Sequence, residues 1–285
     1  MKICRFDDNR IGLVKAGAIY DASAVLEQLP DFRWPLPLGD ALIARLPELA
    51  PQLEAAARDA SPIPLAAVQL LSPVANPSKI IAAPVNYAKH MQEIASDASL
   101  HQGVEVKPIQ SLGLFLKAVS SLVGAGEGVK LRFAERVTDH EVELAVVVGR
   151  RAARVPRARA LDYVAGYAVG LDMTLRGSEL RSLRKSLDSY TVLGPWLTTA
   201  DEIADPGKLG LRLRVNGEPR QESSTRNLVF DVPRLIELAS SFYTLLPGDV
   251  IMTGTPEGVA PVAHGDRIEA EIDEIGTMTV GVGTA

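Results

Sequence analysis

The chain has 285 residues, of which 47% are hydrophobic and 23% are charged, and its formal net charge is −5. Such a composition is typical of a soluble globular protein with a sizeable core. A weakly acidic balance gives no electrostatic reason to expect nucleic acid or an anionic membrane as a partner. No signal-peptide pattern opens the sequence, and no apolar run reaches the roughly 18 residues that a membrane span needs. We therefore expect a cytoplasmic protein.

The single cysteine, Cys4, excludes an internal disulfide and a cysteine-based zinc cluster. Its neighbours in MKICRF alternate as in a strand, which favours a small buried side chain over a nucleophile. The following turn residues, Asp7-Asp8-Asn9 and Ala16-Gly17, predict short strands on either side of them. In ALIARLPELAPQLEAAARDA, helical composition is interrupted by Pro47 and Pro51, so we expect two short helices there.

A proline-punctuated segment, SPIPLAAVQLLSPVANPSK, follows these helices and is typical of a connector between two units. The sequence therefore predicts a small N-terminal α/β domain over residues 1–75 and a catalytic domain over residues 76–285.

From residue 79 onward, strand patterns dominate, as in HEVELAVVVGR and YVAGYAVGLDMT. The segment LRLRVNGEPRQ carries Asn216-Gly217 between alternating runs, which is a strong signal for a two-residue hairpin. The clearest helix is DVPRLIELASSFYTL, with Asp231 as its N-cap and Pro233 in its first turn. GDVIMTGTP then returns to extended structure, and RIEAEIDEIGTMTVGVG reads as a final hairpin. The expected fold class is α+β with a β-rich core.

Two glutamates, Glu141 and Glu143, stand two residues apart in one predicted strand and are expected to share a face. Beside the apolar run LAVVV, two like charges repel each other and are costly to bury. A Mg²⁺ or Mn²⁺ ion would relieve both costs, because these ions prefer oxygen ligands. The alternative is a solvated sheet face on which both glutamates pair with basic side chains. A third carboxylate, Asp172, ends another β-rich run, but an acidic residue at a strand end is commonly only a turn former.

Several ordered segments of the chain together resemble the fumarylacetoacetate hydrolase superfamily, in its branch of acylpyruvate hydrolases and 2-hydroxyhepta-2,4-diene-1,7-dioate isomerases. The resemblance covers roughly residues 79–283, and its segments are KIIAAPVNYAKHMQEI, LFLKAVSSLVG, TDHEVELAVVVGRRA, YVAGYAVGLDMTLR, KSLDSYTVLGPWL, VNGEPRQ and PGDVIMTGTPEGVAPV. It implies a mixed β-roll core, usually assembled as a homodimer, and a divalent metal held by Glu141, Glu143 and Asp172.

The resemblance also implies roles for further residues. The lysine of the K-S-x-D segment is Lys185, and the H-x-x-E pair after N-Y is His90 and Glu93, which are implied to act in catalysis. Substrate-binding positions are implied at Arg176, Gly254 and Thr255.

Each of these residues also has a simpler interpretation. His90 and Glu93 are spaced as a helix-surface pair, and Gly254 could serve only as a turn residue. His140 should point away from the face of Glu141, so we do not expect it to be a ligand. His101 lies in the segment 92–110, which we expect to close over the site, and it remains possible as a site residue.

The chemistry implied is hydrolysis of a 2,4-dioxo acid. A 2-oxo acid offers its carboxylate and adjacent carbonyl to the metal, and this would stabilise the enolate formed when C3 and C4 separate. His90, oriented by Glu93, would take a proton from the attacking water, and Lys185 would neutralise the developing oxyanion. The products would be pyruvate and a carboxylic acid, and the expected partner is a small 2-oxo acid.

Three readings of function remain open on the sequence. The first is the carbon–carbon hydrolase, and the second is a decarboxylase of a diacid such as oxaloacetate, or an isomerase of a 2-hydroxymuconate-type acid. The third is a non-catalytic binding or scaffolding protein, which would not need a histidine base beside a metal. Gly177 and Glu179 depart from the common pattern of the superfamily. The nearby arginines Arg176, Arg181 and Arg184 suit a second carboxylate, as in fumarylpyruvate or maleylpyruvate.

Overall fold

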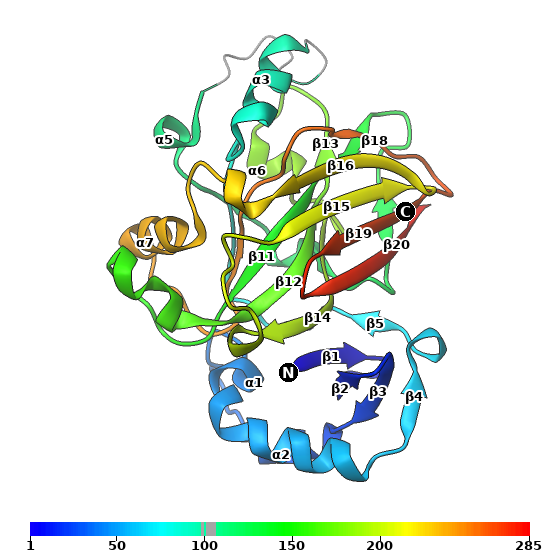
Figure 1. The fold of residues 1–285 in the computed structure, drawn as a ribbon, viewed down its shortest axis with the longest axis vertical. Helices are drawn as coiled ribbons and strands as arrows, with labels where there is room; N and C mark the ends of the chain where they lie inside the picture. Colours follow the sequence, from blue (N-terminus) through cyan, green and yellow to red (C-terminus); the bar gives the residue numbers. More distant parts are fainter. Residues whose placement is uncertain (98–99, 101–106) are drawn as a thin grey trace.

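A computed structural model describes residues 1–97, 100 and 107–285. Within this part of the chain, β-sheets form the body of the molecule and helices cover its outside (Figure 1). In the largest sheet, the main path of hydrogen-bonded strands runs in the order β4 (Pro62–Pro64), β3 (Ala18–Asp21), β2 (Arg10–Lys15), β1 (Lys2–Phe6), β14 (Thr191–Thr199), β12 (Val164–Asp172), β11 (Val142–Val148), β17 (Val250–Met252), β6 (Ile80–Ala82) and β7 (Phe115–Lys117). Two short strands join this path from the side, β5 (Leu70–Leu71) on β1 and β8 (Leu122–Val123) on β14.

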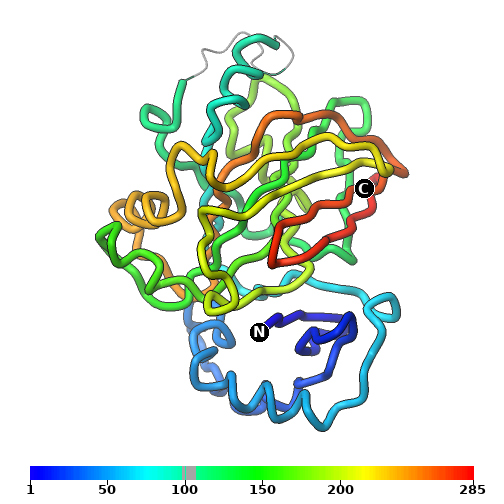
Figure 2. The backbone as a smooth tube through the Cα atoms, in the orientation of Figure 1, coloured from blue at the N-terminus to red at the C-terminus, as the bar shows by residue number. Residues whose placement is uncertain are grey.

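A second sheet lies against the first. Its strands are β16 (Glu218–Ser224), β15 (Gly210–Val215), β19 (Arg267–Ile272), β20 (Gly276–Thr284) and β9 (Val129–Leu131). A small third sheet consists of β13 (Thr174–Leu175), β10 (Thr138–His140) and β18 (Ala260–Pro261). In Figure 2 the blue N-terminal segment lies at one end of the molecule, and the yellow-to-red strands lie beyond it.

The helices lie between and around the strands. The α-helices of the described residues are α1 (Ala41–Ala44), α2 (Leu46–Asp59), α3 (Ala88–Ser96), α5 (Ile109–Leu112), α6 (Arg181–Arg184) and α7 (Val232–Phe242). The 3₁₀ helices are η1 (Ser23–Gln28), η2 (Leu65–Ala67), η3 (Val119–Ser121), η4 (Arg157–Tyr163), η5 (Ala200–Glu202) and η6 (Thr225–Asn227). None of the described helices is long and apolar enough to cross a membrane. The α+β class predicted from the sequence is confirmed.

Strand β11 explains why the core has two layers. All seven of its residues are buried, and their side chains alternate between the two faces of the sheet. Val142, Leu144 and Val146 pack into the core shared with β15, β19 and β20. Ala145 and Val147 pack on the other face, in the core that includes the apolar side of α2. The near-continuous apolar run of this strand therefore reflects burial on both faces.

The N-terminal strands are confirmed at their predicted turns. Asp7 and Asn9 have φ of 47° and 65°, and Ala16 and Gly17 have φ of 47° and 78°, as tight turns between strands require. Strand β1 pairs antiparallel with β14, so the largest sheet continues from these strands into the core. A domain division at about residue 75 stays a prediction.

Two helices form in the predicted helical segment, but they divide elsewhere than expected. The break falls at Arg45, and Pro47 sits in the first turn of α2, where its missing N–H costs nothing. Pro51 lies inside α2, so our expectation that it would divide the segment is wrong. The helix continues through it because its apolar side, including Leu49 and Leu53, is buried against the sheet.

Two further predictions are confirmed downstream. Asn216 and Gly217 have φ of 53° and 84° and join β15 to β16 as a tight hairpin. Helix α7 begins after Asp231, whose carboxylate accepts a hydrogen bond from the backbone N–H of Arg234.

Cys4 is fully buried in β1, and burial raises the pKa of its thiol to about 12. The thiol of the native protein therefore stays protonated at pH 8 and lacks solvent access. We expect negligible alkylation by iodoacetamide in the native protein and complete alkylation in guanidinium chloride. Labelling of the native protein at the rate of the denatured protein would contradict this burial.

Candidate active site and metal centre

Three buried carboxylates meet where β11 and β12 run side by side. Asp172 is the last residue of β12, and Glu143 is the second residue of β11. Glu141 lies in the link between β10 and β11 rather than inside a strand, which corrects the predicted strand there. Its backbone carbonyl accepts the N–H of Asp172 at 2.9 Å, which fixes the link to β12. One ligand oxygen from each of the three carboxylates lies within 4.8 Å of the others.

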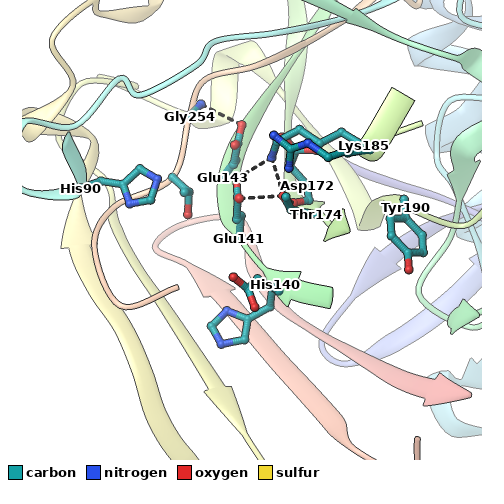
Figure 3. Close-up of polar contacts among 12 residues, drawn as sticks. His90, His140, Glu141, Glu143, Asp172, Thr174, Lys185, Tyr190 and Gly254 are labelled. Atoms are coloured by element: carbon teal, nitrogen blue, oxygen red, sulfur yellow. Dashed lines mark hydrogen bonds and ion pairs between the residues drawn. The ribbon is translucent and has the colours of Figure 1, made fainter. Parts of the chain in front are cut away.

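Two lysines contact this cluster. One of them, Lys185, is drawn beside the carboxylates in Figure 3. Lys185 Nζ donates to Glu141 Oε2 at 2.8 Å and to Asp172 Oδ2 at 2.7 Å. It also donates to the hydroxyl of Thr174 at 2.6 Å. Lys117 Nζ donates to the other oxygen of Asp172. When all are ionised, the two lysines offset two of the three negative charges, so the cluster still favours a further cation.

The two glutamates differ in their electrostatic surroundings. Burial raises the pKa of Glu143 well above its usual value, and the nearby charge of Asp172 raises it further. Burial also acts on Glu141, but the charges of Lys185 and Arg176 outweigh it and lower the pKa of Glu141 to about 2. Glu143 is thus the carboxylate of the cluster whose negative charge is least compensated by the protein.

The residues present fit a divalent metal ion. Oxygen-only donor sets suit Mg²⁺ and Mn²⁺, and three carboxylates at this mutual distance can reach one ion. A cation beside Glu143 would also remove the cost of an uncompensated buried charge. The simpler alternative, a solvated sheet face, is excluded because Glu141, Glu143 and Asp172 are at most 6% exposed.

His90 and Glu93 form a hydrogen-bonded pair on helix α3. His90 Nδ1 lies 2.8 Å from Glu93 Oε2, and His90 is 5% exposed. The second carboxylate oxygen of Glu93 accepts the backbone N–H of Gly258 at 2.8 Å, which fixes the carboxylate. Because the carboxylate accepts a hydrogen bond from Nδ1, Nε2 is the nitrogen that can take up a proton. The pair therefore joins a buried imidazole to a partly exposed carboxylate that two hydrogen bonds hold in place, unlike a solvated helix-surface pair.

The T-G-T-P segment, residues 253–256, contacts the carboxylate cluster through its backbone. Gly254 has φ of 98°, and a Cβ at this position would lie 2.7 Å from Asn86 Cβ, so the turn requires glycine. Its backbone N–H donates to Glu143 Oε2 at 2.7 Å (Figure 3). Thr255 is buried and lies in the wall of the cavity beside the cluster.

A cavity of about 350 Å³ connects these groups. Its volume falls in the range of small-molecule sites. Among the residues singled out from the sequence, the cavity is lined by His90, Glu141, Glu143, Asp172, Arg176, Arg181, Arg184, Lys185 and Thr255. Segments far apart in the chain thus contribute to one site.

His140 lies apart from the carboxylate cluster. His140 Nδ1 lies 3.2 Å from Gln221 Oε1, and Figure 3 shows its ring turned away from the carboxylate cluster. Burial lowers the pKa of His140 to about 4, which keeps the ring neutral. His101, and residues 98–99 and 101–106 of the expected closing segment 92–110, lie outside the described residues.

Four residues of the site received no role from the sequence. They share full or nearly full burial of a polar side chain, and they are Asn86, Lys117, Thr174 and Gln221. For Lys117 a signal was present, since a lysine inside the short apolar strand β7 predicts a buried charge that needs an acidic partner. No local pattern pointed to Gln221, because its partners come from segments far away in sequence.

Gln221 links the carboxylate cluster to the T-G-T-P segment, residues 253–256. Its side-chain oxygen accepts from the backbone N–H of Val142, between two proposed ligands, and lies 3.2 Å from the ring of His140. Its side-chain nitrogen donates to the hydroxyl of Thr255 at 2.8 Å and to the carbonyl of Pro256 at 2.9 Å. The amide thereby holds the ligand segment and the cavity wall at a fixed distance.

We expect Gln221→Leu to lower the free energy of unfolding by about 2 kcal/mol and to raise KM by about tenfold. Leucine fills the space but leaves the N–H of Val142 and the hydroxyl of Thr255 without this partner. Urea unfolding and steady-state kinetics measure the two effects. Gln52→Leu, at an exposed position of α2, is the matched control and should change neither. Unchanged stability and KM in Gln221→Leu would contradict the proposed link.

Comparison with known proteins gives a consistent result. The family described as fumarylacetoacetate (FAA) hydrolase C-terminal matches residues 79–283. A maleylpyruvate hydrolase of Aquipseudomonas alcaligenes is 56% identical over 284 residues, which cover 99% of both chains. The mitochondrial oxaloacetate tautomerase Fahd2a of Rattus norvegicus is 39% identical over 230 residues, which cover 76% of this chain and 70% of that protein.

A solved structure extends the similarity to the whole fold. The crystal structure of maleylpyruvate hydrolase from Sphingobium sp. SYK-6, in complex with a manganese(II) ion and pyruvate, matches with a TM-score of 0.84 at 41% identity. The match covers 100% of both chains, and it confirms the fold that the sequence segments implied. The chain belongs to the fumarylacetoacetate hydrolase family.

Proposed function

We propose that this protein is a divalent-metal-dependent hydrolase that cleaves a carbon–carbon bond of an acylpyruvate, with a diacid such as maleylpyruvate or fumarylpyruvate as its substrate. The observation that carries the proposal is the oriented His90–Glu93 dyad in the same cavity as three clustered carboxylates. The full-length similarity to maleylpyruvate hydrolases supports the reaction class.

Glu141, Glu143 and Asp172 are the residues that would hold Mn²⁺ or Mg²⁺. When bound there, the ion supplies Lewis-acid polarisation of the carboxylate and carbonyl oxygens of a 2-oxo acid. A manganese(II) ion accompanies pyruvate in the Sphingobium relative, which supports Mn²⁺ for this chain as well.

Three side chains would carry out the proton transfer and the charge stabilisation of the hydrolysis. His90 Nε2 takes a proton from water as the water oxygen adds to the C4 carbonyl carbon, and Glu93 holds the ring in place. The bond between C3 and C4 then breaks, its electron pair remains with C3, and protonation there gives pyruvate beside a second carboxylic acid. Lys185 would neutralise the negative charge that develops on oxygen.

Three residues would bind the substrate without chemistry of their own. Arg176 Nε donates to Asp139 Oδ2 at 2.6 Å, and this ion pair holds the guanidinium beside the cavity. Gly254 keeps the T-G-T-P turn close to Glu143, and Thr255 offers its hydroxyl to a substrate carboxylate.

The same metal site could also serve decarboxylation or tautomerisation of oxaloacetate, and the rat relative is named for the second. One panel of substrates separates these activities. The purified protein is incubated with Mn²⁺ or Mg²⁺ and with maleylpyruvate, oxaloacetate or a 2-hydroxymuconate, and the products are identified by chromatography. We expect pyruvate and maleate from maleylpyruvate at the highest kcat/KM. A protein that releases CO₂ from oxaloacetate, or isomerises the 2-hydroxymuconate, but forms no pyruvate from maleylpyruvate would overturn the hydrolase proposal.

We further propose a homodimer in the cytoplasm, which the family resemblance and the absence of a membrane-spanning helix among the described residues support. Light scattering coupled to size-exclusion chromatography tests the dimer, and a monomer at micromolar concentration would contradict it. Cell fractionation tests the location.

A further inference from the structure

Two arginines of the cavity wall have no acidic partner among the residues that the structure describes. Arg181 and Arg184 lie three residues apart at the two ends of α6, so they share one face of this helical turn. Both line the cavity that contains the carboxylate cluster. Within residues 1–97, 100 and 107–285, no ion pair joins either guanidinium to a carboxylate.

Two charged neighbours on this wall, Arg176 and Glu179, already have partners of opposite charge. Arg176 donates to the buried Asp139 at 2.6 Å. Glu179, the acid closest in sequence, receives two hydrogen bonds from Arg136, both at 2.9 Å. The carboxylates of Asp139 and Glu179 are therefore both engaged by other arginines, and neither acts as the counter-ion of Arg181.

The two unpaired guanidiniums are held in position by other contacts. Arg184 donates to the backbone carbonyls of Glu179 at 2.8 Å and Leu175 at 3.1 Å. Arg181 Cζ lies over the ring of Phe115, 5.6 Å from its centroid, and Phe115 also lines the cavity, so a cation–π contact holds the guanidinium there. Burial lowers the pKa of both arginines, because attraction to more distant carboxylates does not offset the loss of water. Among the described residues no side-chain hydrogen bond engages Arg181, and a partly desolvated guanidinium with free donors is suited to bind an anion from solution.

We propose that Arg181, supported by Arg184, forms the subsite for the second carboxylate of a diacid substrate. This inference rests on the proposed function, because it assigns the two ends of the substrate. The pyruvoyl end goes to the carboxylate cluster, and the distal carboxylate goes to α6. The site would thereby select 2,4-dioxo diacids over acylpyruvates that end in an alkyl group.

The test compares two substrates that differ in the distal carboxylate, maleylpyruvate and acetylpyruvate. In Arg181→Gln we expect kcat/KM for maleylpyruvate to fall about 30-fold, mostly through KM, while kcat/KM for acetylpyruvate changes less than about threefold. Arg181→Lys keeps the positive charge and should recover part of the diacid preference. Arg58→Gln, at an exposed position of α2, is the matched control and should behave as the wild type on both substrates.

A binding experiment separates this inference from the proposed function. Calorimetry measures the affinity of the metal-free protein for maleate and for isocrotonate, the cis monoacid that has a methyl group in place of one carboxylate. We expect wild type to prefer maleate by about tenfold and Arg181→Gln to lose this preference. If wild type hydrolyses neither acylpyruvate but shows this binding pattern, the proposed function fails and the subsite stands. Equal losses on both substrates in Arg181→Gln, or an unchanged preference for the diacid in kinetics and binding, would overturn the subsite.

Discussion

Glu143→Gln is expected to abolish Mn²⁺ binding and to lower kcat/KM by about a thousandfold or more, while the fold is retained. The substitution keeps the shape of the side chain and its acceptor for the N–H of Gly254, but it removes one of three negative charges from the cluster. Isothermal calorimetry measures the metal affinity. Thermal unfolding with and without Mn²⁺ gives a second readout, because a ligand at 100 times its Kd stabilises the native state by about 2.7 kcal/mol.

The control and the metal-free protein sharpen this test. Glu54→Gln, at an exposed position of α2, should bind Mn²⁺ as the wild type does. Because the pKa of Glu143 is raised in the folded protein, its carboxyl stabilises the native state only at low pH, and this contribution is lost as pH rises above about 4.5. Metal-free Glu143→Gln should therefore be at least as stable as metal-free wild type at pH 7. Full activity of Glu143→Gln after chelation, dialysis and return of Mn²⁺ would overturn the metal centre.

Local rules predict only that Glu141 and Glu143 lie close together, although Glu141 precedes the strand instead of lying in it. A strand places residues two apart on one face, and the apolar run after Glu143 predicts that the strand is buried. The resemblance, and not a local pattern, assigned Asp172 to this cluster. In the structure it lies at the end of β12, which pairs antiparallel with β11 and places Gly170 opposite Glu143. What the spacing alone left open was whether the glutamates face solvent, and the low exposure of Glu141 and Glu143 decides that question.

Other parts of the site depend on contacts between distant segments. Lys117 reaches Asp172 from β7, 55 residues earlier, and Gln221 reaches Val142 across 79 residues. Neither pairing has a periodicity that a sequence reveals, because each depends on how the sheets pack. Pro51 is a similar case at the level of secondary structure, since tertiary packing of α2 outweighs the local cost of an internal proline. The proposed ligands were therefore chosen from the family resemblance, and their supporting contacts became visible only in the structure.

The arginines of the cavity wall show how structure refines a sequence expectation. Arg176, Arg181 and Arg184 were equivalent candidates for a second carboxylate when only their spacing was known. The ion pair of Arg176 with Asp139 distinguishes them, because a guanidinium that already has a buried carboxylate gains less from a second anion. The ion pairs of the described residues therefore favour Arg181 as the arginine that binds the second carboxylate. Its spacing in the sequence alone does not distinguish it from Arg176 and Arg184.

His90→Gln is expected to lower kcat for acylpyruvate hydrolysis by about 10²- to 10⁴-fold while Mn²⁺ affinity remains within about twofold of wild type. Glutamine can still donate a hydrogen bond to Glu93, but it cannot take a proton from water, and none of the three proposed ligands is altered. Quenched-flow or steady-state kinetics with maleylpyruvate, beside calorimetry with Mn²⁺, separates loss of the base from loss of the metal. His264→Gln, at an exposed position, is the matched control and should hydrolyse maleylpyruvate at the wild-type rate.

The same variant also discriminates between the activities that this metal site could support. Hydrolysis requires a base for water, whereas loss of CO₂ from oxaloacetate requires only stabilisation of the electron pair left on C3. A His90→Gln protein that still releases CO₂ from oxaloacetate but forms no pyruvate from maleylpyruvate would assign the dyad to water activation. Hydrolysis of maleylpyruvate by His90→Gln at the wild-type rate would remove the dyad from the mechanism, because the proton of the attacking water would then go to another group.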